Sequence, residues 1–417
     1  MSLRIRCSVL RPRADEMKFD WLEDAIIHIV DQKIDKIEPA NLCSEADIHL
    51  PDHLAMPGFV DSHIHFPQSR IIGSASGALL PWLNASVFPE ESRFEDRSYA
   101  ASVANQFCTA LLRHGTVAAG IYSSSHFQST DELCESLSQS GMKAIVGMTL
   151  MDRNAPQTLC RDLQYTKDHS ERLIEKWHQH NSGQIQYCIT PRFAIACSDL
   201  LLDLAGQLSA THQLWMQTHL SENTDEVEFA AELYPNSKDY LGIYEDFGLL
   251  HERSIFAHCI HLSDSEWTRL IDAKAVVAHC ADSNFFLGSG CMPLAQATSR
   301  GARMTMGSDV GAGRSFSLRV TTSRSYDASL ICGQPVYAET LLYHATAGGY
   351  AELGFGRCFQ DKGQADFILL RRPPHSSFKN LLDQILFNRE ITPVEATFIA
   401  GKVRYASNVL HEVLRLT

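Results

Sequence analysis

Short apolar runs recur along the middle of this chain, and each is followed by a longer segment with helical spacing. The runs are "AMPGFVDSHIH", "GTVAAGIYS", "MKAIVGMTLMD", "IQYCITPRF", "LWMQTHLSE", "SIFAHCIH", "AVVAHCADS" and "RMTMGSDV". Helices are expected between them, over 95–113, 131–140, 160–180, 198–211 and 224–248. Strands that alternate with helices pair in parallel, and eight such units predict a TIM-like (β/α)8 barrel.

Both ends of the chain follow a different pattern. Runs such as "LRIRCSVLRPR" alternate as β hairpins do, and "GQADFILLRR" and "ATFIAGKVRYAS" are strand-like too. We therefore predict an α/β protein with two domains. Both termini (1–55 and 362–417) would form a small β-sandwich, and the barrel (56–361) would lie between them.

Composition and charge argue against several classes of protein. Lys and Arg number 36 against 49 Asp and Glu, a net charge of −13 that disfavours a nucleic-acid partner. No run approaches the roughly 20 apolar residues of a membrane span, and a signal peptide is not expected. The 12 cysteines form no C-x-x-C pair, so we expect free thiols in a reducing cytoplasm rather than a zinc ribbon or disulfides.

Metal-binding types of residue stand at the ends of the predicted strands. The carboxyl ends of barrel strands meet at one rim, which is where barrel enzymes place their active sites. His63 and His65 end the first strand, and residues two apart on a strand point to the same face. The other strand ends bring the following side chains to this rim: Arg192, His219, Glu222, His258, His279 and Asp309.

Three histidines and one aspartate form a donor set that suits Zn²⁺ or Fe²⁺. We predict that His63, His65, His219 and Asp309 bind one ion, with an open position for a water of lowered pKa. Taken alone, His219 would be interpreted as a helix cap and Asp309 as a turn residue. Their common position at the rim favours the metal site.

Glu222 and His258 complete the predicted chemistry. Glu222 is expected in the first turn of the helix after His219, as a general acid and base or as a partner of the helix dipole. His258 either binds the ion as an additional ligand or hydrogen-bonds the attacking water. His279 is either a supporting residue or an anchor for the loop that follows.

These residues resemble the amidohydrolase superfamily over nearly the full chain. The resemblance rests on "HIH" at 63–65, "HLSE" at 219–222, "AHC" at 257–259, "SD" at 308–309 and the return segment "KGQADFILL". Within the superfamily, "PGFVDSHIHFPQ", "WLNASVFPEESRF", "TPRF" and "HLSENTDEV" resemble the guanine deaminases. In "TPRF" an arginine stands where two-metal amidases carry a carboxylated lysine, which favours a single ion.

The resemblance implies a cytoplasmic, homodimeric hydrolase that acts on a C–N bond and deaminates guanine in purine catabolism. It implies one zinc ion per subunit, with Fe²⁺ as the alternative, and Glu222, His258 and Asp309 as catalytic residues. The partner would be a small purine, with no nucleic acid and no membrane. The residues expected to contact it are His65, Gln68, Trp82, Arg192, Phe193, His219, Glu222 and Asp309.

Two other functions stay open at this point. A related aminohydrolase acting on 8-oxoguanine, a pterin or a triazine would use the same chemistry, although Gln68 and Arg192 favour a ring that carries a carbonyl. A non-catalytic paralogue that kept the barrel for assembly would have lost ligands. Here the four predicted ligands and Glu222 are all present.

Overall fold

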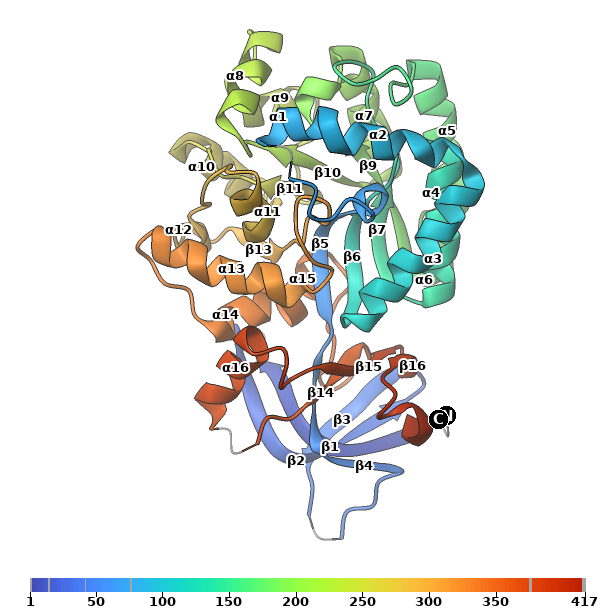
Figure 1. Cartoon of the computed structure of the whole chain (residues 1–417), viewed down its shortest axis with the longest axis vertical. Helices are drawn as coiled ribbons and strands as arrows, with labels where there is room; N and C mark the ends of the chain where they lie inside the picture. Colours follow the sequence, from blue (N-terminus) through green and yellow to red (C-terminus); the bar gives the residue numbers. More distant parts are fainter. Residues whose placement is uncertain (1, 14–15, 42, 76, 375–376, 415–417) are drawn as a thin grey trace.

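Eight parallel strands form a nearly closed barrel in the computed structural model, which describes residues 2–13, 16–41, 43–75, 77–374 and 377–414 (Figure 1). Each strand neighbours the next one along the chain, and each arises from one of the eight apolar runs. The strands are β5 Phe59–His65, β6 Thr116–Tyr122, β7 Lys143–Gly147, β9 Ile185–Pro191, β10 Trp215–Leu220, β11 Ser254–His258, β12 Val276–His279 and β13 Arg303–Met306, with the short β8 Thr149–Leu150 beside β9. The predicted barrel is confirmed.

The barrel closes where its last strand, β13, meets its first, β5. Thr305 Oγ1 donates to Ser62 Oγ (2.7 Å), and Ser62 Oγ donates to the Met306 carbonyl (2.9 Å). Just beyond β13, the Asp309 N–H donates to the His63 carbonyl (2.8 Å). The closure therefore places the first and the last predicted ligands side by side, although 246 positions separate them in the sequence.

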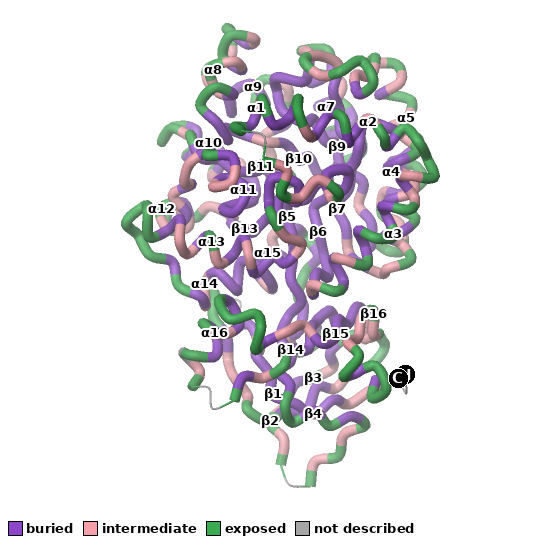
Figure 2. Tube along the Cα trace, viewed as in Figure 1, coloured by how far each residue is buried: buried purple, intermediate pink, exposed green. Residues whose placement is uncertain are grey.

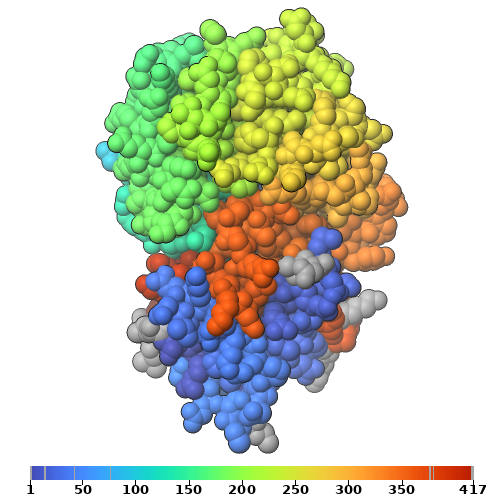
Figure 3. All heavy atoms as spheres, turned by 180° about the vertical axis from the view of Figure 1, so that it is seen from behind, coloured from blue at the N-terminus to red at the C-terminus, as the bar shows by residue number. Residues whose placement is uncertain are grey.

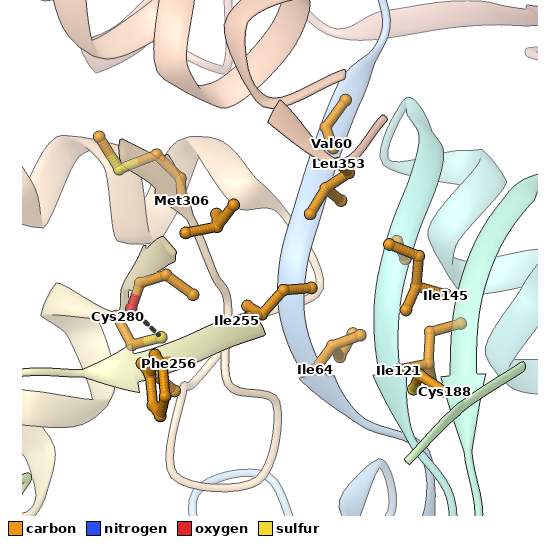
Figure 4. Packing of buried hydrophobic residues seen from close by; sticks show 14 of the residues in the cluster. Val60, Ile64, Ile121, Ile145, Cys188, Ile255, Phe256, Cys280, Met306 and Leu353 are labelled. Carbon is orange, nitrogen blue, oxygen red and sulfur yellow. Dashed lines mark hydrogen bonds between the residues drawn. The ribbon is translucent and has the colours of Figure 1, made fainter. Parts of the chain in front are cut away.

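Apolar side chains cover the barrel strands, as expected for parallel strands that are buried on both faces. All seven residues of β6 and all five residues of β11 are buried. Figure 4 shows Ile64, Ile121 and Ile145 on the neighbouring strands β5, β6 and β7. Figure 2 shows the buried strands inside a layer of helices with exposed outer surfaces.

The helices of the barrel largely agree with the prediction. They are α3 Arg97–Arg113, α4 Phe127–Ser140, α5 Leu163–Trp177, α6 His180–Gly183, α7 Asp199–His212, α8 Thr224–Leu233, α9 Tyr240–Asp246, α10 Asp264–Asp272, α11 Ala281–Phe286, α12 Leu294–Ser299, α13 Leu318–Ile331, α14 Ala338–Tyr343 and α15 Gly349–Glu352. The predicted helix 224–248 is wrong as one element, because Pro235 cannot continue α8 and the chain starts again as α9. Within the described ranges, no helix is both long and apolar enough to cross a membrane.

An insert between β5 and α3 lies across the mouth of the barrel (Figure 1). It consists of the 3-10 turn η2 Phe66–Gln68, α1 Leu79–Trp82, the π-helical turn η3 Leu83–Val87, α2 Phe88–Ser92 and the 3-10 turn η4 Arg93–Glu95. Pro89 lies in the first turn of α2, directly after the π-helical turn η3. This insert supplies one wall of the pocket described below.

Strands from both ends of the chain form a separate sheet beneath the barrel (Figures 1 and 3). In spatial order they are β16 Lys402–Ala406, β15 Val394–Ile399, β14 Phe367–Arg371, β4 Ile48–Pro57, β1 Ser2–Arg13, β2 Lys18–Val30 and β3 Lys33–Pro39. The helices α16 Phe378–Phe387 and α17 His411–Leu414 accompany them. The expected hairpins β1–β2 and β2–β3 are present. The α/β fold class, a barrel with a terminal β-sheet unit, is thus confirmed.

Residues of the terminal sheet alternate between two apolar cores, as successive strand residues do. Along β14, Phe367 and Leu369 pack into the core of the terminal sheet, whereas Ile368 and Leu370 pack into the core of the barrel. The sheet is thereby attached to the barrel through one face. The predicted domain limits, 1–55 with 362–417 and 56–361, include positions outside the described residues and stay a prediction.

Candidate active site

The four predicted ligands lie together at the rim of the barrel. His63 and His65 end β5, His219 is in β10, and Asp309 follows β13. His65 Nε2 lies 3.1 Å from His219 Nε2, and Asp309 Oδ1 lies 3.3 Å from His63 Nε2 and 3.2 Å from His65 Nε2. Two overlapping groups could hold an ion here: His63 with His65 and Asp309, and His63 with His219 and His258.

The surroundings keep the rings of His63 and His219 neutral and Asp309 ionised. Burial lowers the pKa of His63 to about 3 and holds the pKa of His219 well below its usual range. Burial alone would raise the pKa of Asp309, but the rings of His63 and His65, whose Nε2 atoms lie 3.3 and 3.2 Å from its Oδ1, bring it well below its usual range. His219 Nδ1–H donates to the Arg192 carbonyl (2.5 Å), which leaves the lone pair of His219 on Nε2, toward the other ligands.

This donor set fits a divalent cation. The Nε2 atoms of His63 and His258 are buried and have no hydrogen-bond partner in the described part of the chain. Buried polar atoms in folded proteins are almost always satisfied, so both nitrogens indicate a missing partner. Imidazole nitrogens with one carboxylate oxygen are ligands for Zn²⁺ or Fe²⁺. His63, His65, His219 and Asp309 would hold the ion, and their role as ligands stays a prediction.

His258 is held between a helix and two carboxylates. Its Nδ1–H donates to Asn284 Oδ1 (2.8 Å) of α11, and its Nε2 lies 3.5 Å from Glu222 Oε2 and 3.9 Å from Asp309 Oδ2. Burial alone would lower the pKa of His258, but Glu222 and Asp309 raise it. The local pattern indicates only a helix-start or turn residue at Asn284 and does not point to a partner 26 residues away.

Glu222 lies in the turn before α8, so its predicted place in the first helical turn is wrong. The reason is a capping box: Asn223 Oδ1 accepts from the Asp225 N–H, and Glu226 Oε2 accepts from the N–H groups of Glu222 and Asn223. Burial raises the pKa of Glu222 to about 7, while the Ser289 hydroxyl donates to its Oε1 (3.2 Å). A carboxyl group with this pKa can both give and take a proton at neutral pH.

Positive φ angles mark the turns that carry these side chains. Ser221, His258, Cys259 and Asp309 have φ values of 50°, 71°, 51° and 50°. Each costs about 1–3 kcal/mol and persists only where the surroundings hold it. The Cys259 N–H, for example, donates to the Leu220 carbonyl of the neighbouring strand (2.9 Å). Strain of this kind concentrates at functional sites.

A pocket opens beside the cluster. Its lining consists of His65, Gln68, Leu79, Trp82, Leu83, Arg192, Phe193, His219, Glu222, Leu287 and Asp309. All of the residues predicted to contact substrate are in this lining, together with three leucines that no sequence signal separates from the core.

Two polar residues of the pocket, Gln68 and Arg192, share a buried partner that the sequence did not reveal, Glu91, which is not itself part of the lining. Gln68 Nε2 donates to Glu91 Oε1 (3.1 Å), and the Arg192 guanidinium donates to Glu91 Oε2 (2.7 Å). Glu91 is only 1% exposed. The quoted motif "WLNASVFPEESRF" contains it, but the pattern does not distinguish Glu91 from Glu90.

His279 ends β12 and is not part of the pocket lining. Burial lowers its pKa to about 3, and its ring nitrogens have no hydrogen-bond partner among the residues described. Its two predicted roles, as a supporting residue or a loop anchor, stay open.

The sequence profile of the amidohydrolase family matches residues 54–404. The chain belongs to the amidohydrolase family. It is 37% identical over 350 residues to the guanine deaminase of Escherichia coli (strain K12), which covers 83% of this chain and 78% of that protein. It is 34% identical over 316 residues to the guanine deaminase of Dictyostelium discoideum, covering 73% and 69% of the two chains.

Solved structures of amidohydrolases show the same fold. The structure of the E. coli guanine deaminase has a TM-score of 0.91 at 32% identity and covers 98% of this chain and all of that one. The guanine deaminase from C. acetobutylicum, with guanine bound in its active site, has a TM-score of 0.92 at 28% identity, with coverage of 97% and 100%.

Proposed function

We propose that this amidohydrolase is a guanine deaminase, a hydrolase that converts guanine and water to xanthine and ammonia. The observation that carries the proposal is the pocket, whose lining combines Gln68 and Arg192 with residues of the possible metal site and the carboxyl group of Glu222. The relatives described above, which are named guanine deaminases, support the same activity.

The residues at the rim fit one divalent ion, Zn²⁺ or alternatively Fe²⁺, held by His63, His65, His219 and Asp309. Such an ion supplies Lewis-acid chemistry, by which water becomes a nucleophile at neutral pH. Asp309 accepts a proton from the attacking water through its carboxylate. His258, with Nε2 3.5 Å from Glu222 and 3.9 Å from Asp309, orients that water and stabilises the negative charge that develops on it.

Glu222 moves the protons on the substrate. With a pKa near 7, it is partly protonated at neutral pH and can donate its proton to the ring nitrogen beside C2. Protonation makes C2 more electrophilic as the water oxygen bonds to it. The Glu222 carboxylate then takes up the proton that Asp309 accepted from the water and delivers it to the amino group. The C–N bond breaks and ammonia leaves, and the second proton of the water oxygen passes to Glu222 as the new carbonyl of xanthine forms. Glu222 is then protonated and Asp309 ionised as at the start, so that atoms and protons balance.

The other residues of the pocket select and orient the ring. Arg192 and Gln68 offer N–H donors for the guanine carbonyl, and adenine would leave these buried donors unpaired. Phe193, Trp82 and the leucines provide apolar surface that holds a flat ring and excludes water.

Ammonia release from guanine tests this proposal. The zinc-loaded protein should deaminate guanine far faster than 8-oxoguanine, pterin, adenine or cytosine. Glu222→Gln, which keeps the size of the side chain, is the control for ammonia from a contaminating enzyme. Preferred turnover of another ring would retain the metal chemistry and reject guanine as the substrate, and a folded protein that binds no metal would favour the non-catalytic paralogue.

We also propose that the enzyme is a cytoplasmic homodimer in purine catabolism and uses no nucleic-acid or membrane partner. All 12 cysteines are free, which suits a reducing compartment. Ile331 and Tyr337, each 69% exposed, provide apolar surface of the kind that subunits bury. Light scattering of the purified protein and fractionation of cells measure the two properties.

A further inference from the structure

Glu91 is a buried carboxylate to which the reaction described above assigns no step. It accepts hydrogen bonds from two polar residues of the substrate pocket, Gln68 and Arg192. We propose that Glu91 is a positioning residue that makes the pocket specific for an uncharged ring carrying a carbonyl. The proposal deepens the guanine deaminase function and rests on it for the identity of the substrate.

The contacts of Glu91 join three separate parts of the fold. Glu91 is in α2 of the insert, Gln68 is in η2 after β5, and Arg192 follows β9. In sequence, Gln68 and Arg192 are 23 and 101 residues away from Glu91. Side chains with this much rotational freedom hold one geometry only when a fixed partner restrains them. Glu91 is that shared partner.

Arg192 is restrained on two sides by the same short helix. Its guanidinium donates to Glu91 Oε2, and its Cζ lies 5.4 Å from the centre of the Phe88 ring. The remaining N–H groups of Arg192 have no hydrogen-bond partner among the described residues, and Arg192 lines the pocket. Glu91 therefore holds one edge of the guanidinium and leaves the other available to a ligand.

Glu91 also sets the charge of this end of the pocket. Arg192 is 4% exposed and Glu91 is 1% exposed, so the pair is shielded from solvent and its charges cancel locally. A buried guanidinium without this partner would attract anions. The pair thus favours neutral guanine over anionic rings, including the anion that xanthine forms near neutral pH, and so limits inhibition by the product.

The neighbouring glutamate provides a matched control. Glu90 is in the same helix and is 7% exposed, but its carboxylate is bonded by Arg93 (2.9 Å) and by the Tyr99 hydroxyl. It is not part of the pocket lining. Glu90→Gln therefore removes a buried charge from the insert without changing the contacts of Gln68 or Arg192.

The experiment compares the zinc-loaded wild type with Glu91→Gln, Glu91→Asp and Glu90→Gln. Steady-state assays give kcat and KM for guanine, and calorimetry gives the affinities for hypoxanthine, which has the carbonyl but no amino group to lose, and for xanthine. Glu91→Gln removes the charged hydrogen-bond partner of Gln68 and Arg192. We therefore expect it to raise the KM for guanine and the Kd for hypoxanthine by roughly 10- to 100-fold. Metal content should be unchanged, kcat should change less than KM, and the xanthine anion should bind more tightly relative to hypoxanthine.

The control variants separate positioning from general loss of structure. Glu91→Asp keeps the charge and should recover part of the affinity, whereas Glu90→Gln should leave KM at the wild-type value. An unchanged KM and hypoxanthine affinity in Glu91→Gln would overturn the proposal, and so would an equal loss in Glu90→Gln. If Glu91→Gln does not fold, Glu91→Asp becomes the test. A wild-type KM and a wild-type affinity for hypoxanthine in Glu91→Asp would then overturn the proposal. A wild type that binds hypoxanthine but releases no ammonia from guanine would reject the deaminase function, while the binding series would still decide the role of Glu91.

Discussion

Replacing Asn284 by leucine tests whether a single hydrogen bond keeps His258 ready for the reaction. Asn284 is 1% exposed, and its Oδ1 lies 2.8 Å from His258 Nδ1. Leucine has nearly the same size but cannot accept a hydrogen bond. The substitution therefore removes the contact that determines which nitrogen of His258 carries the proton, without removing bulk from α11.

Two responses of His258 are open in this variant, and both impair the site. If Nδ1 keeps its proton, a buried N–H is left unpaired at a cost of about 1–3 kcal/mol. If the proton moves to Nε2, the ring donates toward Glu222 Oε2 or Asp309 Oδ2, at 3.5 and 3.9 Å, instead of orienting the water. Loss of such an orienting partner typically lowers activity or metal affinity by about 10- to 100-fold.

The assay measures kcat for guanine together with the metal content of the purified variant. We expect Asn284→Leu to lose about 10- to 100-fold in kcat and to retain its ion, since His258 is not one of the four predicted ligands. Ser283→Ala is the control, because Ser283 is buried in the same helix and donates to the Cys280 carbonyl (2.9 Å) away from His258. A kcat within twofold of the wild type would refute the reasoning, and loss of the ion would place His258 among the ligands.

Three further perturbations address Glu222, Gln68 and the ion. Glu222→Gln should lower kcat by about 10²- to 10⁴-fold with hypoxanthine affinity and metal content intact, and near-full activity would remove it from the mechanism. Because burial raises the pKa of Glu222 to about 7 and the reaction begins from its protonated form, kcat/KM should fall as pH rises above about 7; a flat pH–rate profile would contradict this. Gly311→Ala would place a Cβ 2.3 Å from Gln68 Oε1 at a φ of +125°, and should raise the KM for guanine more than Gly288→Ala, where φ is +67° and the space is open. A chelator should abolish activity and lower the Tm, and Zn²⁺ should restore both; full activity without metal would reject the predicted site.

The pattern along the chain was sufficient for the barrel and for the kinds of residue at its rim. Eight apolar runs predict eight strands, because a strand that is buried on both faces needs a continuous apolar run. The polar residues at the ends of these runs lie together, because the carboxyl ends of barrel strands meet at one rim. The spacing of His63 and His65 predicts two rings on one face, because side chains alternate along a strand. These features depend on the spacing of apolar and polar residues over a few positions, and that spacing can be seen directly in the sequence.

Contacts between distant segments depended on the tertiary structure. The ion pair of Glu91 with Arg192 spans 101 residues, and the hydrogen bond of Asn284 with His258 spans 26. Neither contact can be recognised from the local sequence, because the residues next to a glutamate in a short motif do not show whether its side chain is buried. The place of Glu222 before α8 was likewise decided by the side chains of Asn223 and Glu226, which accept hydrogen bonds from different N–H groups at the start of the helix. The sequence alone determined which chemical groups reach the rim, because strand periodicity and burial act over a few residues. Which of these groups hold one another in place was decided only when the barrel closed and brought remote strands together.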